Sequence, residues 1–148
     1  MDTNENYIKD QFCSYEISLK LKELGFDEEC FGVYIETNGE PILRYNLPHL
    51  ESQDKVNYIY ERAILTPLWQ QAIDFLETKG YYINITRVFQ WSPLPIKFLG
   101  WCIYIGTENP EEELECNSYY VNHYYSTKQE AREQAILKAI EIINGRSI

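Results

Sequence analysis

The chain has 148 residues, 45% of them apolar and 24% charged, which suits one compact globular domain over residues 1–148 and excludes wholesale disorder. Its 13 Lys and Arg against 23 Asp and Glu give a formal net charge of -10. This charge argues against a protein that coats nucleic-acid phosphates or docks on an anionic membrane surface.

The sequence predicts a cytoplasmic location by default, and with it reduced cysteines. The N-terminus lacks the basic region and apolar core of a signal peptide. The longest apolar stretches, 98–105 and 135–143, are shorter than the roughly 20 residues of a membrane helix. The cysteines are too dispersed for a zinc site, so we expect reduced, metal-free thiols at Cys13, Cys30, Cys102 and Cys116.

The first predicted helix covers residues 14–24, after a polar segment 1–10 that we expect to be frayed. Ile17, Leu21 and Leu24 share one helical face, and Gly25 stands where a helix commonly ends. Ser14 or Asp10 is expected to cap its start.

A β-hairpin is predicted next, with strands over 31–36 and 42–45. Asn38-Gly39 is a strong hairpin signal because both turn positions need a positive φ. A two-residue turn pairs Ile35 with Ile42, whereas a bulge shifts the register; the sequence leaves both open. Pro41 indicates an edge strand.

The middle of the chain predicts a loop over 46–55 and helical structure from 56 to 79. Apolar residues from Val56 to Ile64 indicate a short helix. Thr66 and Pro67 are then typical of an N-cap and a first helical position, and Gly80 of a helix end. One kinked helix and two separate helices both remain open.

The C-terminal half predicts strands over 81–89, 99–105 and 119–125, with Pro93 and Pro95 breaking the chain between the first two. A glutamate-rich loop occupies 108–115. A capping box at 127–130 then begins a helix with its apolar face at Ala131, Ala135, Ile136, Ala139, Ile140 and Ile143. The order of elements predicts an α+β fold: an antiparallel sheet of about five strands with three or four helices packed mainly on one face.

The common catalytic and phosphate-binding motifs GxGxxG, GxxxxGK[ST], HExxH and GxSxG are absent. Each of the two histidines, His49 in a predicted loop and His123 in a predicted strand, is more typical of a structural residue than of a general base. The glutamate-rich loop lacks the spacing and glycine of a calcium-binding EF-hand. We therefore predict no cofactor and no metal, and we favour a non-enzymatic protein.

Tyrosine and asparagine recur on one face of the three later strands. These residues alternate with the apolar positions of each strand, so they should face solvent. Tyrosine supplies stacking area and a polar tip, which suits binding. The alternative is that tyrosine only reflects strand propensity. The candidate binding residues on this face are Tyr82, Asn84, Tyr104, Tyr120, Asn122 and Tyr124.

Two arginines are further candidates. Arg87 is in phase with the apolar residues of its strand, and a buried arginine needs an anionic partner. That partner is either a protein carboxylate or a ligand, unless Arg87 lies at the strand end and reaches water. Arg44 and Arg87 are the residues that we expect to hold a small anionic ligand, if one binds.

Three stretches carry a resemblance: Ser14–Glu16 running into Lys20–Phe26, then Pro67–Phe75, then Glu130–Arg132. Together they resemble small uncharacterised proteins of phages and prophages of gut Bacteroidota. The resemblance brings no activity and no site residues with it. It implies a phage-type accessory protein that works in the host cytoplasm.

Three functions follow as hypotheses. The first is a binding protein that engages a host or phage protein through the tyrosine-rich face, steered by its charge to a basic partner. The second is a small-molecule binder that sequesters a nucleotide signal by aromatic stacking and an arginine. The third is an enzyme of unrecognised type. The partner and the oligomeric state stay open.

Overall fold

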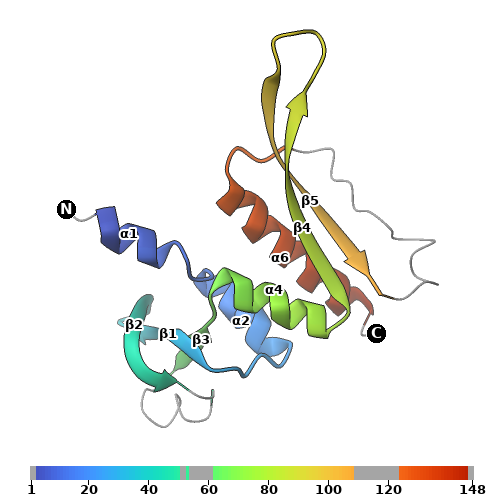
Figure 1. Ribbon diagram of the computed structural model, residues 1–148. Helices are drawn as coiled ribbons and strands as arrows, with labels where there is room; N and C mark the ends of the chain where they lie inside the picture. Colours follow the sequence, from blue (N-terminus) through green and yellow to red (C-terminus); the bar gives the residue numbers. More distant parts are fainter. Residues whose placement is uncertain (1–2, 51–52, 54–61, 109–123, 147–148) are drawn as a thin grey trace. The chain divides into compact units, whose positions relative to one another are not determined.

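The computed structural model describes residues 3–50, 53, 62–108 and 124–146 (Figure 1). Its contacts divide the chain into two compact units, Met1–Ala72 and Ile73–Ile148. The expectation of one domain over 1–148 stays a prediction, because compact units of this size occur within single domains and as separate ones.

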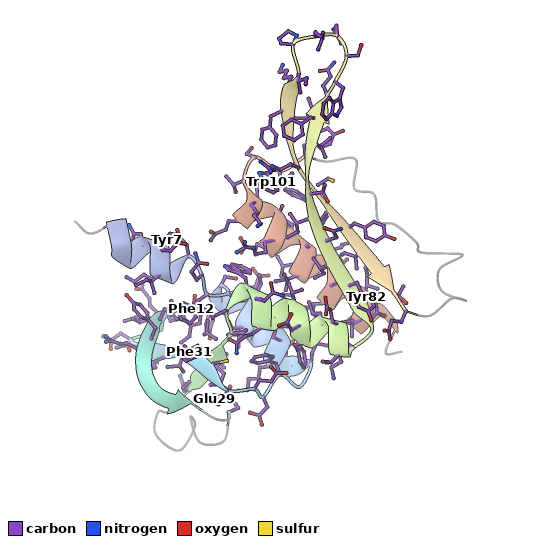
Figure 2. All side chains as sticks on the ribbon, in the orientation of Figure 1. Tyr7, Phe12, Glu29, Phe31, Tyr82 and Trp101 are labelled. Atoms are coloured by element: carbon purple, nitrogen blue, oxygen red, sulfur yellow. The ribbon has the colours of Figure 1, made fainter. Side chains whose placement is uncertain are left out.

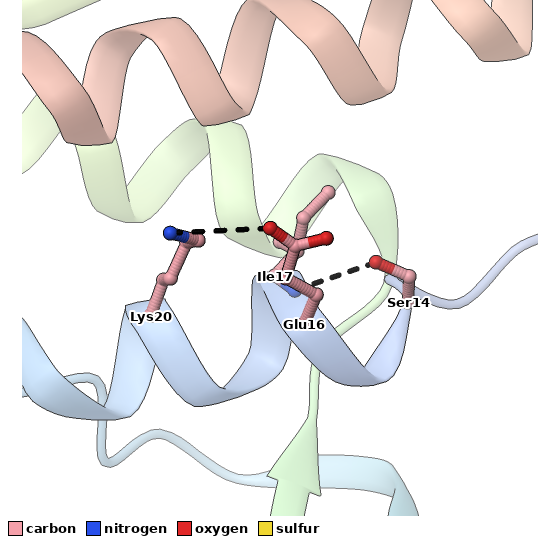
Figure 3. A network of polar contacts seen from close by, with 4 residues as sticks. All are labelled: Ser14, Glu16, Ile17 and Lys20. Atoms are coloured by element: carbon pink, nitrogen blue, oxygen red, sulfur yellow. Dashed lines mark hydrogen bonds and ion pairs between the residues drawn. The ribbon is translucent and has the colours of Figure 1, made fainter.

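Two helices begin the first unit. Helix α1 spans Thr3–Lys9, within the segment 1–10 that we expect to be frayed. Fraying concerns the motion of the segment, so this expectation stays a prediction. Helix α2 spans Tyr15–Glu23 as predicted, with Ser14 as its N-cap: the Ser14 hydroxyl accepts a hydrogen bond from the Ile17 N–H at 3.3 Å (Figure 3). The Lys20 ammonium lies 3.9 Å from the Glu16 carboxylate one turn away. Cap and charges therefore agree with the helix that the sequence predicts.

The sheet of the first unit has three antiparallel strands in the order β2-β1-β3: β1 is Cys30–Thr37, β2 is Glu40–Leu50 and β3 is Ala63–Thr66. The two-residue turn is the register that forms, with Ile35 opposite Ile42. Asn38 and Gly39 have φ values of 54° and 84°. Both are positive, as the predicted turn requires. Pro41 lies on the edge strand β2, as expected.

Two predictions for the middle of the chain are wrong where the structure describes it. Strand β2 continues to Leu50, so residues 46–50, His49 included, are strand and not loop. Ala63 and Ile64 belong to β3 and not to a helix, because the buried run Ala63–Thr66 pairs with β1. A short apolar run fits a buried strand and a buried helix equally well, and the available partner decides between them. The rest of the helix expected from Val56 lies outside the described residues.

The segment before α2 closes one side of this sheet. A Cβ on Gly32 would lie 2.6 Å from the ring of Phe12, so only glycine lets that ring approach β1. The Phe12 ring also stacks on Tyr45, and the Tyr34 hydroxyl donates to the Cys13 carbonyl at 3.2 Å. The core of the first unit therefore joins α2 and the sheet through Phe12 and Cys13.

Helix α4, Trp69–Thr78, begins two residues later than predicted, since Thr66 ends β3 and the Pro67 carbonyl accepts a hydrogen bond from the Cys13 N–H. The Gln71 side chain instead caps the start by accepting from the Leu68 N–H at 3.0 Å. Gly80, with a φ of 87°, follows the helix as expected.

The second unit is built on a long hairpin. Strands β4, Tyr81–Gln90, and β5, Lys97–Thr107, pair antiparallel from Tyr81 opposite Thr107 to Gln90 opposite Lys97. A register shift between Val88 and Phe89 gives β5 one extra residue at that point. The predicted break at Pro93 and Pro95 is the connection between the strands, where both prolines follow cis peptide bonds.

Helix α6, Lys128–Arg146, packs against this hairpin. The Thr127 hydroxyl accepts from the Glu130 N–H at 3.1 Å, as predicted for the capping box, while the Glu130 carboxylate accepts from the Ser126 N–H. Ala131 and Ala135 are fully buried against Ile103 of β5. Small residues on the helix let it approach the strands closely.

The fold is α+β, as predicted, with four helices in the described part of the chain. Its five described strands are all antiparallel but form two sheets, of three and two strands, in place of the single sheet expected. Strand β1 has a partner on each side, and β4 pairs with β5.

Candidate binding surface

The tyrosine-rich face lies on the hairpin of the second unit. Asn84 of β4 is directly opposite Tyr104 of β5, and Tyr82 is opposite Gly106. Tyr82 is 38% exposed and Tyr104 is 40% exposed, while their neighbours Ile83 and Ile103 point to the other side and pack against α6. We call the side with Tyr82, Asn84, Thr86, Cys102 and Tyr104 the open face, and the side that packs against α6 the helix face. The predicted strand phase is confirmed for both strands.

Two glycines of β5 let tyrosine rings lie on the open face. A Cβ on Gly106 would lie 3.2 Å from the Tyr104 ring, so that ring rests along its own strand. A Cβ on Gly100 would lie 2.9 Å from the Tyr124 Cβ and 2.8 Å from the Tyr125 carbonyl oxygen. Tyr124, which is 49% exposed, is thereby held on the same face. Contacts with glycines of β5 thus position the Tyr104 ring and the backbone and Cβ of Tyr124, and both side chains stay at least 40% exposed.

Tyr125, the next residue, ties this segment to β5. Its backbone exchanges two hydrogen bonds with Trp101, at 2.8 and 2.9 Å. Burial, followed by the negative charge of Glu130, raises the pKa of the Tyr125 hydroxyl. Tyr120, Asn122 and His123, the other candidates from the predicted last strand, lie outside the described residues.

A carboxylate occupies one end of the open face. The Tyr82 hydroxyl donates a hydrogen bond to Glu108, which directly follows β5. This hydrogen bond is the main reason why the pKa of Tyr82 is raised above its ordinary value. Tyr82 therefore stays a neutral hydrogen-bond donor well into the alkaline range.

Arg87 is on the helix face, as its phase predicts, but it is exposed and not buried. Its guanidinium lies over the ring of Trp101, 5.9 Å from the ring centre, and the Lys128 ammonium lies over the same ring at the same distance. Helix α6 begins at Lys128, and Figure 2 shows the start of this helix near Trp101. The part of the hairpin that α6 covers therefore ends beside Trp101. Of the interpretations given for Arg87, the one that agrees with the structure is an arginine whose side chain reaches water. No ion pair joins it to a carboxylate of the described segments.

Arg44 belongs to the other unit. It lies exposed on the edge strand β2, opposite the buried Val33 of β1. The structure therefore places Arg44 in a different sheet from the tyrosines, and Arg87 on the face of the hairpin opposite to them. Within the hairpin, the arginine candidate and the tyrosine candidates therefore lie on opposite faces.

The sequence reasoning missed the far end of the hairpin, residues 89–99. In this segment six large apolar side chains are at least a third exposed: Phe89, Trp91, Leu94, Ile96, Phe98 and Leu99. The sequence does signal this surface, as a run of apolar residues on both sides of Pro93 and Pro95. The two prolines alone predict only a break between strands.

In the described ranges no three His, Cys, Asp or Glu side chains gather into a group that could hold a metal ion. Cys13, Cys30 and Cys102 are free thiols, the first two buried. Cys116 lies outside these ranges, so the prediction for all four cysteines stays a prediction.

The chain matches no protein-family model, no curated protein and no solved structure. Of the helices that the structure describes, none is both long enough and apolar enough to cross a membrane.

Proposed function

We propose that this protein is a non-enzymatic binding protein, a phage-type accessory protein of the host cytoplasm, that engages a partner protein through the open face of β4 and β5. The helices of the fold then lie mainly on the other side of the strands and leave this face to the partner. The observation that carries the proposal is that Tyr82, Asn84, Tyr104 and Tyr124 share one exposed face, opposite the side that packs against α6.

The chemistry of this face suits a protein partner. Tyrosine rings bury a large area at a low cost in side-chain entropy, and interface cores are enriched in them. The Tyr104 ring already rests on Gly106, so little freedom of this side chain is lost when a partner covers it. The amide of Asn84 supplies polar contacts, and the Tyr82 hydroxyl, which donates to Glu108, can still accept a hydrogen bond from a partner.

The proposal is tested with Tyr82→Ala and Tyr104→Ala in a binding assay on the partner that a pull-down from host lysate identifies. Each substitution is expected to weaken binding about thirtyfold, the effect of losing an aromatic residue at the centre of an interface. Tyr120→Ala is tested in the same way, because the sequence predicts Tyr120 on this face.

Tyr7→Ala is the matched control, because Tyr7 is 69% exposed on α1 of the other unit. It should leave binding unchanged. Melting temperatures separate binding from folding: if Tyr104→Ala lowers the melting temperature and reduces binding only in proportion to unfolding, the tyrosines serve the fold and the proposal is wrong.

A further inference from the structure

A continuous row of aromatic rings runs along the hairpin away from α6. The Trp101 ring meets Phe98 edge-on at 6.3 Å, Phe98 meets Phe89 on the opposite strand at 5.5 Å, and Phe89 meets Trp91 at 6.4 Å. We call these four residues the aromatic row. Trp101 is half-buried, whereas the three residues beyond it are exposed: Phe98 by 45%, Phe89 by 36% and Trp91 by 69%.

The aromatic row continues the surface on which α6 packs. Trp101 itself packs against the core formed by Ile103, Ala131 and Ala135. The helix begins at Lys128, beside Trp101, and the hairpin extends well past that point (Figure 1). One strip of the hairpin is thus covered by α6 over its inner part, whereas no described helix of the second unit covers the apolar side chains of its outer part.

Folded proteins rarely leave such a strip to water unless something binds there. Leu94 and Ile96, in the connection beyond the row, add side chains that are 79% and 50% exposed. The exposed apolar residues are contiguous in this one segment, which distinguishes them from the single exposed apolar residues found on most surfaces.

The charge on this segment indicates the partner. Residues 81–107 contain Arg87 and Lys97 and no Asp or Glu, whereas the rest of the chain holds all 23 acidic residues. Lys128 adds a third cation beside the row. Two copies of the chain meeting row to row would bring these cations together, which is unfavourable. A partner with acidic residues around an apolar stripe would pair with them.

We infer that the aromatic row binds an acidic amphipathic helix of a partner protein, which lies along the hairpin as an extension of α6. The apolar stripe of that helix covers Trp91, Phe89 and Phe98, and its flanking carboxylates meet Arg87 and Lys128, which both lie over the Trp101 ring. The inference concerns the side of the hairpin opposite the tyrosines, so it does not depend on the proposed function of the open face.

Peptide display on the full-length chain tests this inference. The probe is a library of random peptides about 15 residues long, roughly four helical turns. Enriched peptides are expected to be net negative, with apolar residues at helical spacing. They should bind Trp91→Ala and Phe98→Ala at least about tenfold more weakly than the unaltered chain, with little change in melting temperature.

Charge reversal provides a second variant that leaves every apolar contact in place. The double substitution Arg87→Glu and Lys128→Glu should also weaken binding of the acidic peptides about tenfold or more. Phe31→Ala is the matched apolar control, since Phe31 is 64% exposed on β1 of the other unit. Tyr104→Ala should leave peptide binding unchanged, which separates this surface from the open face.

Several results would overturn the inference. The inference is wrong if no peptides are enriched, or if the enriched peptides are basic or non-helical. It is also wrong if they bind the Trp91→Ala variant as well as the unaltered chain. Flotation of the chain on phosphatidylcholine–phosphatidylglycerol vesicles that Trp91→Ala abolishes would identify a lipid surface as the occupant. A dimer in light scattering that the same substitution dissociates would identify a second copy.

Discussion

At the scale of single residues, Asn38 and Gly39 decide how the first hairpin is paired. Both adopt a positive φ, and the resulting two-residue turn brings Thr37 opposite Glu40 and Ile35 opposite Ile42. Their backbone twist matches the twist of the two strands, which a turn with negative φ values would not. The choice between two registers that the strand pattern leaves open is thus made by two residues of the turn.

Gly39→Val is expected to lower the free energy of unfolding by about 1–3 kcal/mol, because a β-branched residue is strained at a φ of 84°. Gly145→Val is the matched control. A Cβ meets open space at both positions, but Gly145 has no positive φ. Chemical denaturation of both variants gives the comparison; equal stability would contradict the account of the turn.

Cys30 illustrates how burial alters the chemistry of a residue. Burial, followed by the negative charges of Glu28 and Glu29, raises the pKa of its thiol from 9.0 to about 12. Because the thiolate is the reactive form, the native chain should react with iodoacetamide much more slowly at Cys30 than at the half-buried Cys102. Mass spectrometry over time measures both rates, and unfolding in guanidinium should make them similar.

The same shift in pKa predicts how stability depends on pH. Between about pH 9 and 12 the unfolded chain loses the Cys30 proton while the folded chain keeps it. The free energy of unfolding should therefore fall as the pH rises through this range, with no contribution from Cys30 below it. Cys30→Ala should reduce that fall; a slope unchanged by the substitution would contradict the assignment.

At the scale of elements, the small residues of α6 determine how closely the helix meets the hairpin. Ala131, Ala135 and Ala139 are fully buried at intervals of four residues, so they lie along one side of the helix. On the sheet side Ile83, Ile85 and Ile103 supply the larger volumes. The interface therefore pairs small residues on the helix with large ones on the strands.

Ala135→Leu is expected to destabilise the chain by about 1–3 kcal/mol, because a filled interface must move apart to admit the larger side chain. Gln134→Leu is the control, since Gln134 is exposed on the same turn. It should change stability by less than about 0.5 kcal/mol. Thermal or urea unfolding of the two variants tests the difference; similar losses would show that α6 does not pack tightly through Ala135.

At the scale of the whole molecule, charge is distributed unevenly along the chain. The net charge of -10 describes the average, while the hairpin over residues 81–107 is basic and the remaining residues carry every carboxylate side chain. The net charge of the whole chain governs the long-range steering of partners, whereas the local cations of the hairpin govern which partners bind to it. Arg87 and Lys128 lie over Trp101 on the helix face, so they act on a partner that docks on that face.

Affinity for duplex DNA is expected to be negligible at physiological salt. Binding to DNA requires several cations that replace counterions on the phosphates, and the hairpin supplies only Arg87 and Lys97. A gel shift with micromolar protein at about 0.15 M salt checks this expectation. A retarded band that disappears in Arg87→Glu would contradict it.

The sequence by itself determined the local structure of this protein. Four features follow from patterns within a few residues: helix α2 with its Ser14 cap, the Asn38-Gly39 turn, the phase of β4 and β5, and the start of α6 at its capping box. The exposure of Tyr82 and Tyr104 follows from the same alternation. These features were predictable because neighbouring residues alone decide them.

Only the tertiary structure decided what depends on partners distant in the chain. Ala63 and Ile64 form a strand because β1 offers an unpaired edge, and the same apolar run would suit a helix elsewhere. The described strands divide into two sheets, and which strands pair with which is a matter of contacts between distant parts of the chain. Arg87 is exposed because α6 begins only at Lys128, and the apolar end of the hairpin lies open for the same reason. Periodicity assigns a side chain to a face of its strand, but whether another element covers that face depends on where the rest of the chain packs.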